Sequence, residues 1–131
     1  MMQINETFGE REQHVKILFV EDSAEDLKLV LQELKNGGIK PDYERVYREG
    51  DFRTALGRGG WDIVLCDYTM PNFSGLKALE VLRALSMDLP FIIVSGTIGE
   101  ETAVEVMLKV AHYYILKDRL VRLVPDIRRE L

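Results

Sequence analysis

The sequence predicts an α/β domain built on a parallel β-sheet. Short apolar runs alternate with amphipathic stretches five times between Val15 and the end of the 131-residue chain, and this alternation is typical of βαβ units. Three of the runs are continuously apolar and the run at residues 15–20 is interrupted only by Lys16, as expected of strands covered by helices on both faces. Because almost half of the residues are hydrophobic, we expect one domain with one packed core at this length.

Five strands are expected in this sheet. They are predicted at residues 15–20, 43–47, 63–66, 91–94 and 113–116. The second run contains Glu44 and Arg45, and charged residues discourage the outermost strand of a sheet from pairing with another chain. We therefore expect the second strand at an edge.

Apolar residues three and four positions apart predict the helices between the strands. Such stripes occur at Leu27, Val30, Leu31 and Leu34, at Leu76, Leu79, Leu82 and Leu85, and at Ala103, Val106, Met107 and Val110. A final amphipathic helix is expected over residues 120–131, with Pro125 in its first turns. Capping and glycine signals should bound the first three helices, namely Ser23 with Asp26, Gly37–Gly38, Gly50 or Asp51, Gly59–Gly60, and Ser74 or Gly75.

Composition and charge exclude several classes of protein. A net charge of −5 argues against direct binding of nucleic acid, which needs clustered Lys and Arg. The lone Cys66 cannot form an internal disulfide, and its apolar surroundings predict a buried thiol. Without about 18 consecutive apolar residues or a signal peptide, no membrane partner and a cytoplasmic location are expected. Residues 1–14 lack periodicity and are expected to form a flexible tail before a domain at 15–131.

Polar residues follow four of the predicted strands. Glu21 and Asp22 come after the first strand, Asp67 after the third, Ser95 after the fourth and Lys117 after the fifth. Ligands of open parallel sheets bind at the carboxyl ends of the strands, and right-handed crossovers bring those ends to one edge. We therefore expect these side chains to converge.

Three converging carboxylates would repel one another unless a cation lies among them. Oxygen ligands of this kind suit Mg²⁺ (or Mn²⁺) better than zinc. Each residue also has a simpler explanation: Glu21 and Asp22 as acids at a helix N-terminus, Asp67 as a turn residue, Lys117 as a surface lysine, and Ser95 as a helix cap. The combination of positions favours the cation site.

The motifs together resemble a known family. Val20-Glu21-Asp22, Asp67 to Pro71 with Gly75, Val94-Ser95-Gly96, and Tyr114 three positions before Lys117 resemble the receiver domain of two-component response regulators, the CheY-like group. The resemblance covers residues 15–131. It implies a flavodoxin-like (βα)5 three-layer sandwich with a parallel five-stranded sheet in the order 2-1-3-4-5.

The resemblance also implies a role for each residue. Asp67 would accept a phosphoryl group from the phosphohistidine of a histidine kinase or histidine phosphotransfer protein. Glu21, Asp22, Asp67 and the main-chain carbonyl of Thr69 would bind Mg²⁺, directly or through water, and Lys117 and Ser95 would contact the phosphoryl oxygens. The chain would then assist its own phosphorylation and dephosphorylation rather than act as an ordinary enzyme, either alone or within a hybrid histidine kinase.

Signalling would follow from movement of Ser95 and Tyr114. This movement would reshape the face formed by the fourth predicted helix, which contains Ala103 to Val110, the strand at 113–116 and the final helix. A homodimer through that face is a further expectation. Thr69 and Thr97, which lie where side chains could gate attack by water, are expected to influence the lifetime of the phosphoryl group.

The sequence departs from the family pattern at several positions. Glu21 stands where Asp is frequent, and Val110 and Tyr113 stand where many members have Gly and Asp. Asp118 replaces a proline that follows a cis bond, so a rearranged or strained loop is expected there. The unusual stretch from Val110 to Asp118 supports one alternative, a degenerate receiver that acts as a phosphorylation-independent interaction module. A flavin protein is disfavoured by the acidic first turn, and a haloacid-dehalogenase-like phosphatase by Thr69, where it would need Asp.

Overall fold

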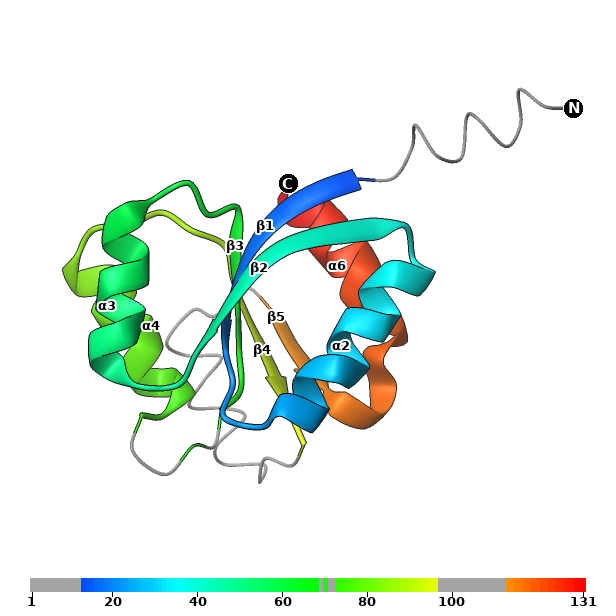
Figure 1. Ribbon diagram of the computed structural model, residues 1–131, viewed down its shortest axis with the longest axis horizontal. Coiled ribbons are helices and arrows are strands. Elements are labelled where there is room, and N and C mark those ends of the chain that lie inside the picture. The colour runs from blue at the N-terminus through cyan, green and yellow to red at the C-terminus, as the bar shows by residue number, and fades with distance from the viewer. Residues whose placement is uncertain (1–12, 69, 71–72, 97–112) are drawn as a thin grey trace, which may run out of the picture.

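The protein forms an α/β sandwich around a five-stranded parallel sheet (Figure 1). The structure is a computed structural model that describes residues 13–68, 70, 73–96 and 113–131. The strands are β1 (Gln13–Val20), β2 (Ile39–Val46), β3 (Ile63–Cys66), β4 (Phe91–Ser95) and β5 (Tyr113–Leu116). Their order is β2-β1-β3-β4-β5, which confirms the predicted fold class, the strand order and the edge position of the second strand.

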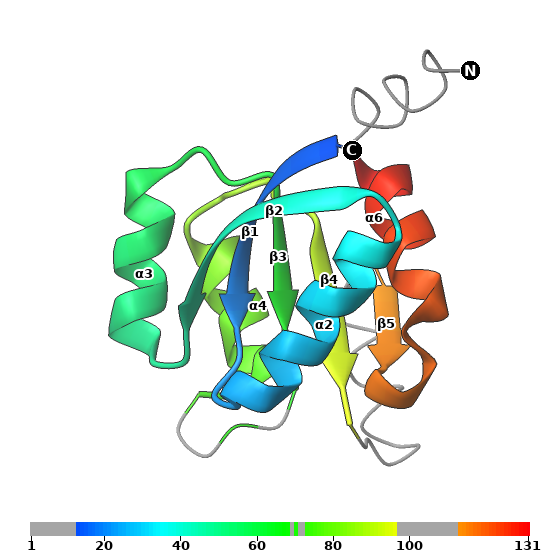
Figure 2. The same cartoon turned by 45° about the vertical axis from the view of Figure 1, so that its right-hand side comes forward.

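Helices cover both faces of the sheet. In Figures 1 and 2, α3 (Glu49–Arg58) and α4 (Gly75–Ala84) lie on one face, and α2 (Ala24–Asn36) and α6 (Leu123–Glu130) lie on the other. Alternate side chains of each strand point to opposite faces. In β1, Leu18 and Val20 join the core under α3 and α4, whereas Ile17 and Phe19 join the core under α2 and α6. The sheet therefore separates two apolar cores.

The first two strands begin earlier than the sequence predicts. β1 starts at Gln13 rather than Val15, and β2 starts at Ile39 rather than Tyr43 and ends one residue before Tyr47. The two starting residues are paired in the register of the sheet, and the Gln13 amide donates to the Gly38 carbonyl at 2.9 Å. Main-chain pairing thus extends the strands through polar residues, and a proline is tolerated because β2 is an edge strand. The predicted tail at residues 1–14 is therefore too long, because Gln13 and His14 belong to β1, and residues 1–12 lie outside the described residues.

Most of the predicted helix signals act where expected. Ser23 caps α2 by accepting a hydrogen bond from the amide of Asp26 at 3.2 Å. Ser74 caps α4 in the same way, and Gly37 and Gly59 end α2 and α3. Helix α3 begins at Glu49, slightly before the predicted Gly50 or Asp51, because its first turn closes on the Arg48 carbonyl. The predicted helix that contains Ala103 to Val110 lies outside the described residues.

The last helix differs from its prediction. A 3-10 helix, η1 (Lys117–Arg122), precedes an α-helix that begins only at Leu123, not at Leu120. Proline has no amide hydrogen, and the first-turn amides of an α-helix have no intrahelical acceptor. A start at Leu123 places Pro125 in that first turn, where its missing donor costs nothing.

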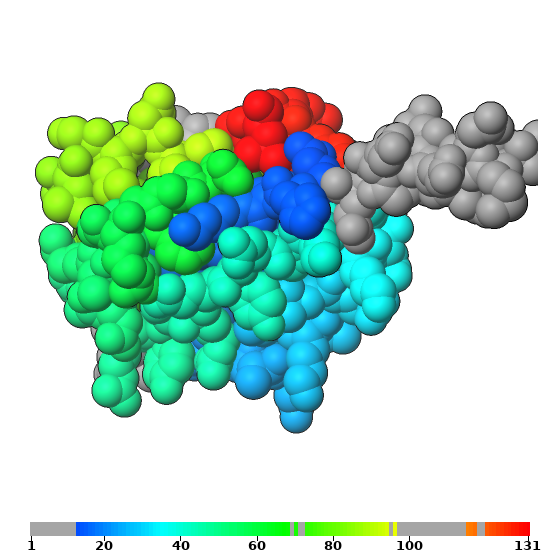
Figure 3. All heavy atoms as spheres, turned by 45° about the horizontal axis from the view of Figure 1, so that its top comes forward, coloured from blue at the N-terminus to red at the C-terminus, as the bar shows by residue number. Residues whose placement is uncertain are grey.

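The end of α6 is fastened to the beginning of the sheet. The Arg128 guanidinium donates to the side chain of Gln13 at 3.2 Å and to the carbonyl of Gly37 at 2.8 Å. Figure 3 shows α6 (red) beside the start of β1 (blue).

Within the described residues, no helix has the length and apolar character to cross a membrane. Cys66 is a buried free thiol, as predicted.

Candidate functional site

Parallel strands bring three predicted site residues to one edge of the sheet. The strands all run toward the lower edge of Figure 2, and Glu21, Asp67 and Lys117 each directly follow a strand. The Glu21 amide donates to the Val46 carbonyl at 2.9 Å, and the Asp67 amide donates to the Val20 carbonyl at 2.8 Å. The sheet's hydrogen bonding thus continues into the site and fixes the backbone of both acids.

The three predicted carboxylates lie together. One carboxylate oxygen from each of Glu21, Asp22 and Asp67 falls within a set whose members are all within 4.8 Å of one another. Glu21 and Asp67 are buried, with 5% and 7% of their surfaces exposed, whereas Asp22 is exposed. The predicted convergence of these three carboxylates is therefore confirmed. The cluster offers a hard cation three oxygen ligands and one open side.

Electrostatics make this cluster unfavourable for negative charge alone. Burial raises the pKa of Glu21, and the charge of Asp67 raises it further, against the lowering effect of Lys117. Burial likewise raises the pKa of Asp67, again opposed by Lys117. A divalent cation would relieve both the mutual repulsion and the cost of burial. The donor set therefore fits Mg²⁺, with Glu21, Asp22 and Asp67 as the residues that could hold it.

Lys117 brings a positive charge to the same cluster. Its Nζ lies 2.5 Å from Asp26 Oδ2, 2.9 Å from Glu21 Oε1 and 3.4 Å from Asp67 Oδ1. Only 12% of the side chain is exposed. Although burial lowers the pKa of Lys117, the hydrogen bonds and charges of these carboxylates raise it above its ordinary value. The ammonium therefore stays charged beside Asp67 at neutral pH.

Sequence reasoning missed Asp26, which it treated only as part of a helix cap. The side chain of Asp26 turns to Lys117, and the Ser23 amide is instead bonded by Glu21 Oε2 at 3.2 Å. Only one half of the expected capping box therefore forms. The local sequence carried no signal for this contact, because the partner of Asp26 lies 91 positions further along the chain.

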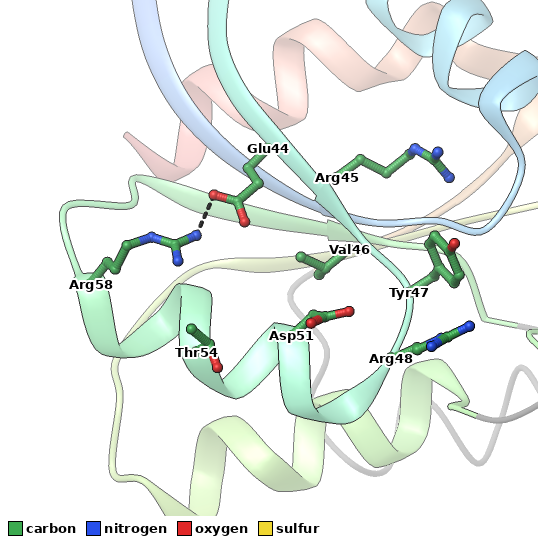
Figure 4. Close-up of a pocket in the computed structure, with 8 residues that line it drawn as sticks. All are labelled: Glu44, Arg45, Val46, Tyr47, Arg48, Asp51, Thr54 and Arg58. Carbon is green, nitrogen blue, oxygen red and sulfur yellow. Dashed lines mark hydrogen bonds and ion pairs between the residues drawn. The ribbon is translucent and has the colours of Figure 1, made fainter.

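A second basic residue supports the acidic loop from the neighbouring strand. The Arg45 guanidinium of β2 donates to the carbonyls of Glu21 and Asp22 at 3.2 and 3.4 Å. A separate hollow of about 290 Å³ lies between β2 and α3, and Figure 4 shows the side chains that line it. The residues lining this hollow are Glu44, Arg45, Val46, Tyr47, Arg48, Asp51, Thr54 and Arg58. It includes none of the clustered acids.

Gly75 lets the start of α4 approach the loop after β3. A Cβ at this position would lie 3.0 Å from the Asp67 carbonyl oxygen and 3.0 Å from the Tyr68 Cα. The Gly75 amide also donates to the Tyr68 carbonyl at 2.9 Å. A side chain at this position would push the helix away from Asp67.

Other predicted site residues are described only in part. Ser95 ends β4, and Tyr114 lies on the adjacent β5, but their side chains lie outside the described part of the structure. Thr69, Thr97 and Val110 lie outside it altogether.

The described backbone contains no cis peptide bond, and the chain enters η1 directly at Lys117. Of the two predicted outcomes for the Lys117–Asp118 link, the structure has the rearranged loop.

Known proteins share this fold. The family described as the response regulator receiver domain matches residues 17–127. The swarming motility regulation protein RssB of Serratia marcescens is 29% identical over 103 residues, which are 79% of this chain and 46% of RssB. This chain therefore spans less than half the length of that relative.

Solved structures agree with the family match. The signal receiver domain of a signal transduction histidine kinase from Syntrophus aciditrophicus superposes with a TM-score of 0.75 at 22% identity, covering 89% of each chain. The BeF3-activated N-terminal receiver domain of Klebsiella pneumoniae RstA gives a TM-score of 0.71 at 25% identity, covering 86% of this chain and 98% of that one. With the family match over most of its length, this chain belongs to the response regulator receiver domains of two-component signalling.

Proposed function

We propose that this receiver domain accepts a phosphoryl group on the carboxylate of Asp67. The observation that carries the proposal is the position of Asp67 directly after the central strand of the sheet, between an acidic pair and an ammonium group. The donor would be a phosphohistidine of a histidine kinase or histidine phosphotransfer protein, and the metal would be Mg²⁺ (or Mn²⁺). Glu21, Asp22 and Asp67 would hold the metal, with the main-chain carbonyl of Thr69 added by resemblance.

The chemistry is an in-line displacement at phosphorus. A carboxylate oxygen of Asp67 forms a bond to phosphorus while the bond from phosphorus to the donor imidazole nitrogen breaks. The imidazole leaves with the electron pair and takes a proton from solvent. Such transfers depend mainly on positioning and on neutralising the charge of the phosphoryl oxygens. The metal supplies part of that positive charge when bound, and Lys117 supplies the rest as a compact ammonium on a long side chain.

The output of the switch would emerge beside β5. Ser95 would contact a phosphoryl oxygen, and Tyr114 would reorient behind it. This would change the face formed by β5, α6 and the predicted helix that contains Ala103 to Val110. The adjacency of the two positions on neighbouring strands supports this route. Thr69 and Thr97 would gate water, and a homodimer through this face and a cytoplasmic location remain predictions. The net charge of −5 disfavours direct contact with nucleic acid.

The alternative is a degenerate receiver that binds partners without phosphorylation. Its support was the unusual sequence around Asp118, yet Lys117 reaches the acidic cluster despite that departure. The complete set of acids and lysine favours the phosphoryl acceptor.

Acetyl phosphate provides a direct test because it can donate a phosphoryl group without a kinase. Intact-protein mass spectrometry should show one added phosphoryl group in the presence of Mg²⁺ and none in the presence of EDTA. The Asp67→Asn variant should remain unlabelled. The variant Asp88→Asn, altered at an exposed aspartate, should be labelled like the wild type. Labelling that persists in Asp67→Asn, or a wild type that responds to neither acetyl phosphate nor beryllofluoride, would refute the proposal.

A further inference from the structure

Asp26 makes the shortest contact that Lys117 has in the site. The distance from Lys117 Nζ to Asp26 is 2.5 Å, compared with 2.9 Å to Glu21 and 3.4 Å to Asp67. We propose that Asp26 is a positioning residue that holds Lys117 at the rim of the acidic cluster and competes with a phosphoryl group for it. The inference rests on the proposed role of Asp67 and adds a residue that controls it.

Local structure leaves the Asp26 carboxylate available for this contact. Its amide is bonded to Ser23 Oγ, which fixes the residue in the first turn of α2. In a complete capping box the Ser23 amide would donate to the Asp26 carboxylate, but here it donates to Glu21 Oε2 instead. The Asp26 side chain is 37% exposed, whereas Lys117 is 12% exposed. The Asp26 carboxylate therefore forms the more solvent-exposed end of this ion pair.

The three partners of Lys117 differ in their second role. Glu21 and Asp67 each contribute an oxygen to the potential metal site, whereas Asp26 does not. A cation held by Glu21 and Asp67 competes with Lys117 for their oxygens, and Asp26 then becomes the partner that keeps the ammonium nearby. A phosphoryl group on Asp67 must in turn draw Lys117 away from Asp26. Asp26 should thus favour binding of the cation and disfavour retention of the phosphoryl group.

The substitution Asp26→Asn separates these two effects. Without the carboxylate, Lys117 shifts toward Glu21 and Asp67, so Mg²⁺ should bind about fivefold more weakly, a change of about 1 kcal/mol for a partly exposed ionic hydrogen bond. Beryllofluoride, a phosphoryl mimic, should bind about fivefold more tightly at saturating Mg²⁺ because its competitor is gone. Isothermal titration calorimetry measures both affinities.

A neighbouring acid controls for the simple loss of a negative charge. Glu25 lies in the same helical turn and is exposed, so Glu25→Gln removes the same charge without touching the contact to Lys117. Both affinities should then stay within about twofold of the wild type, as for an exposed charge. The conservative Asp26→Glu should retain the wild-type pattern. Equal effects of Asp26→Asn and Glu25→Gln would overturn the inference.

A metal-free measurement tests the same contact independently of phosphorylation. In a double-mutant cycle in EDTA, Asp26→Asn should shift the urea midpoint much less in a Lys117→Met background than in the wild type. Additive shifts would overturn the inference even if Asp67 is phosphorylated normally. If instead acetyl phosphate fails to label the wild type, the proposed function fails, and a non-additive cycle still supports Asp26 as the residue that positions Lys117.

Discussion

Asp67 should destabilise the metal-free protein, so Asp67→Asn should increase the free energy of unfolding. The carboxylate is 7% exposed, and burial raises its pKa. Its nearest charges are the two other acids of the cluster and Lys117. Replacing the carboxylate with a neutral amide of nearly the same shape removes both the repulsion and the cost of burying a charge.

The size of the effect follows from the distances in the cluster. At an effective dielectric constant of about 20, two like charges about 5 Å apart repel by about 3 kcal/mol. The opposite charge of Lys117 at 3.4 Å attracts by about 5 kcal/mol on the same scale. The repulsion of Asp67 by the two other acids thus slightly exceeds its attraction to Lys117. The cost of desolvating the buried carboxylate adds to this net destabilisation. We expect Asp67→Asn to stabilise the protein by about 1–2 kcal/mol at neutral pH.

Urea denaturation followed by tryptophan fluorescence measures this difference. Trp61 is the only tryptophan, and its indole donates to the Ala55 carbonyl at 2.8 Å, so it reports unfolding without being part of the site. Asp88→Asn at an exposed position should leave the free energy of unfolding unchanged. Saturating Mg²⁺ should stabilise the wild type more than Asp67→Asn. An Asp67→Asn protein that is no more stable than the wild type in EDTA would refute this electrostatic reasoning.

The raised pKa of Asp67 also predicts how the stability difference between Asp67→Asn and the wild type depends on pH. Because the pKa of Asp67 is raised in the folded protein above its usual 3.8, the native state holds this proton more tightly than the unfolded state. The wild type should therefore lose stability as pH rises from the unfolded-state pKa through the folded-state pKa. The advantage of Asp67→Asn should vanish at acidic pH and grow toward neutrality. A difference that is constant with pH would contradict the assigned cause.

Three further predictions use local contacts. Gly75→Ala should destabilise the protein by about 1–3 kcal/mol, because the added Cβ would press on the Asp67 carbonyl. The control Gly57→Ala, in a helix with open space around the glycine, should be neutral or stabilising. If Gly75→Ala and Gly57→Ala had equal urea midpoints, the packing argument would be refuted. Ser74→Ala should cost about 1 kcal/mol by removing the cap of α4, and Ser74→Asp should retain stability in the same assay. Cys66, buried and with its pKa raised by burial, should react with iodoacetamide only as fast as the protein unfolds, and rapid native labelling would contradict its burial.

The positions of the clustered acids could be predicted because strand ends are readable in the sequence. The run ending at Cys66 is continuously apolar, the run ending at Val20 is apolar from Ile17 onward, and both stop abruptly at an acid. In a parallel sheet, all such ends lie at one edge. The identity of the residues then sufficed to predict that Glu21, Asp22 and Asp67 converge, with no knowledge of side-chain conformation.

The start of β2 could not be read in this way. As an edge strand it pairs only with β1 and faces solvent along its other side, so its first residues need not be apolar. Lys40, Pro41 and Asp42 therefore look like a loop in the sequence, although main-chain hydrogen bonds hold them in the sheet.

The partner of Asp26 was also beyond local rules. Ser23 and Asp26 have the spacing of a capping box, which predicts a bond between neighbours in the sequence. The ammonium of Lys117, 91 residues away, is a stronger partner for a carboxylate than a neutral amide. The competition between a local and a distant partner is decided by the tertiary structure, which a capping motif does not contain.

The central claim is that Asp67 carries the phosphoryl group, and its location on the chain can be measured. Borohydride reduces an aspartyl phosphate to homoserine, which tandem mass spectrometry assigns to a single position. After treatment with acetyl phosphate and Mg²⁺, the wild type should contain homoserine in place of Asp67 and at no other aspartate. Homoserine at Asp22 or Asp26, or none in a protein that has gained a phosphoryl group, would contradict the account.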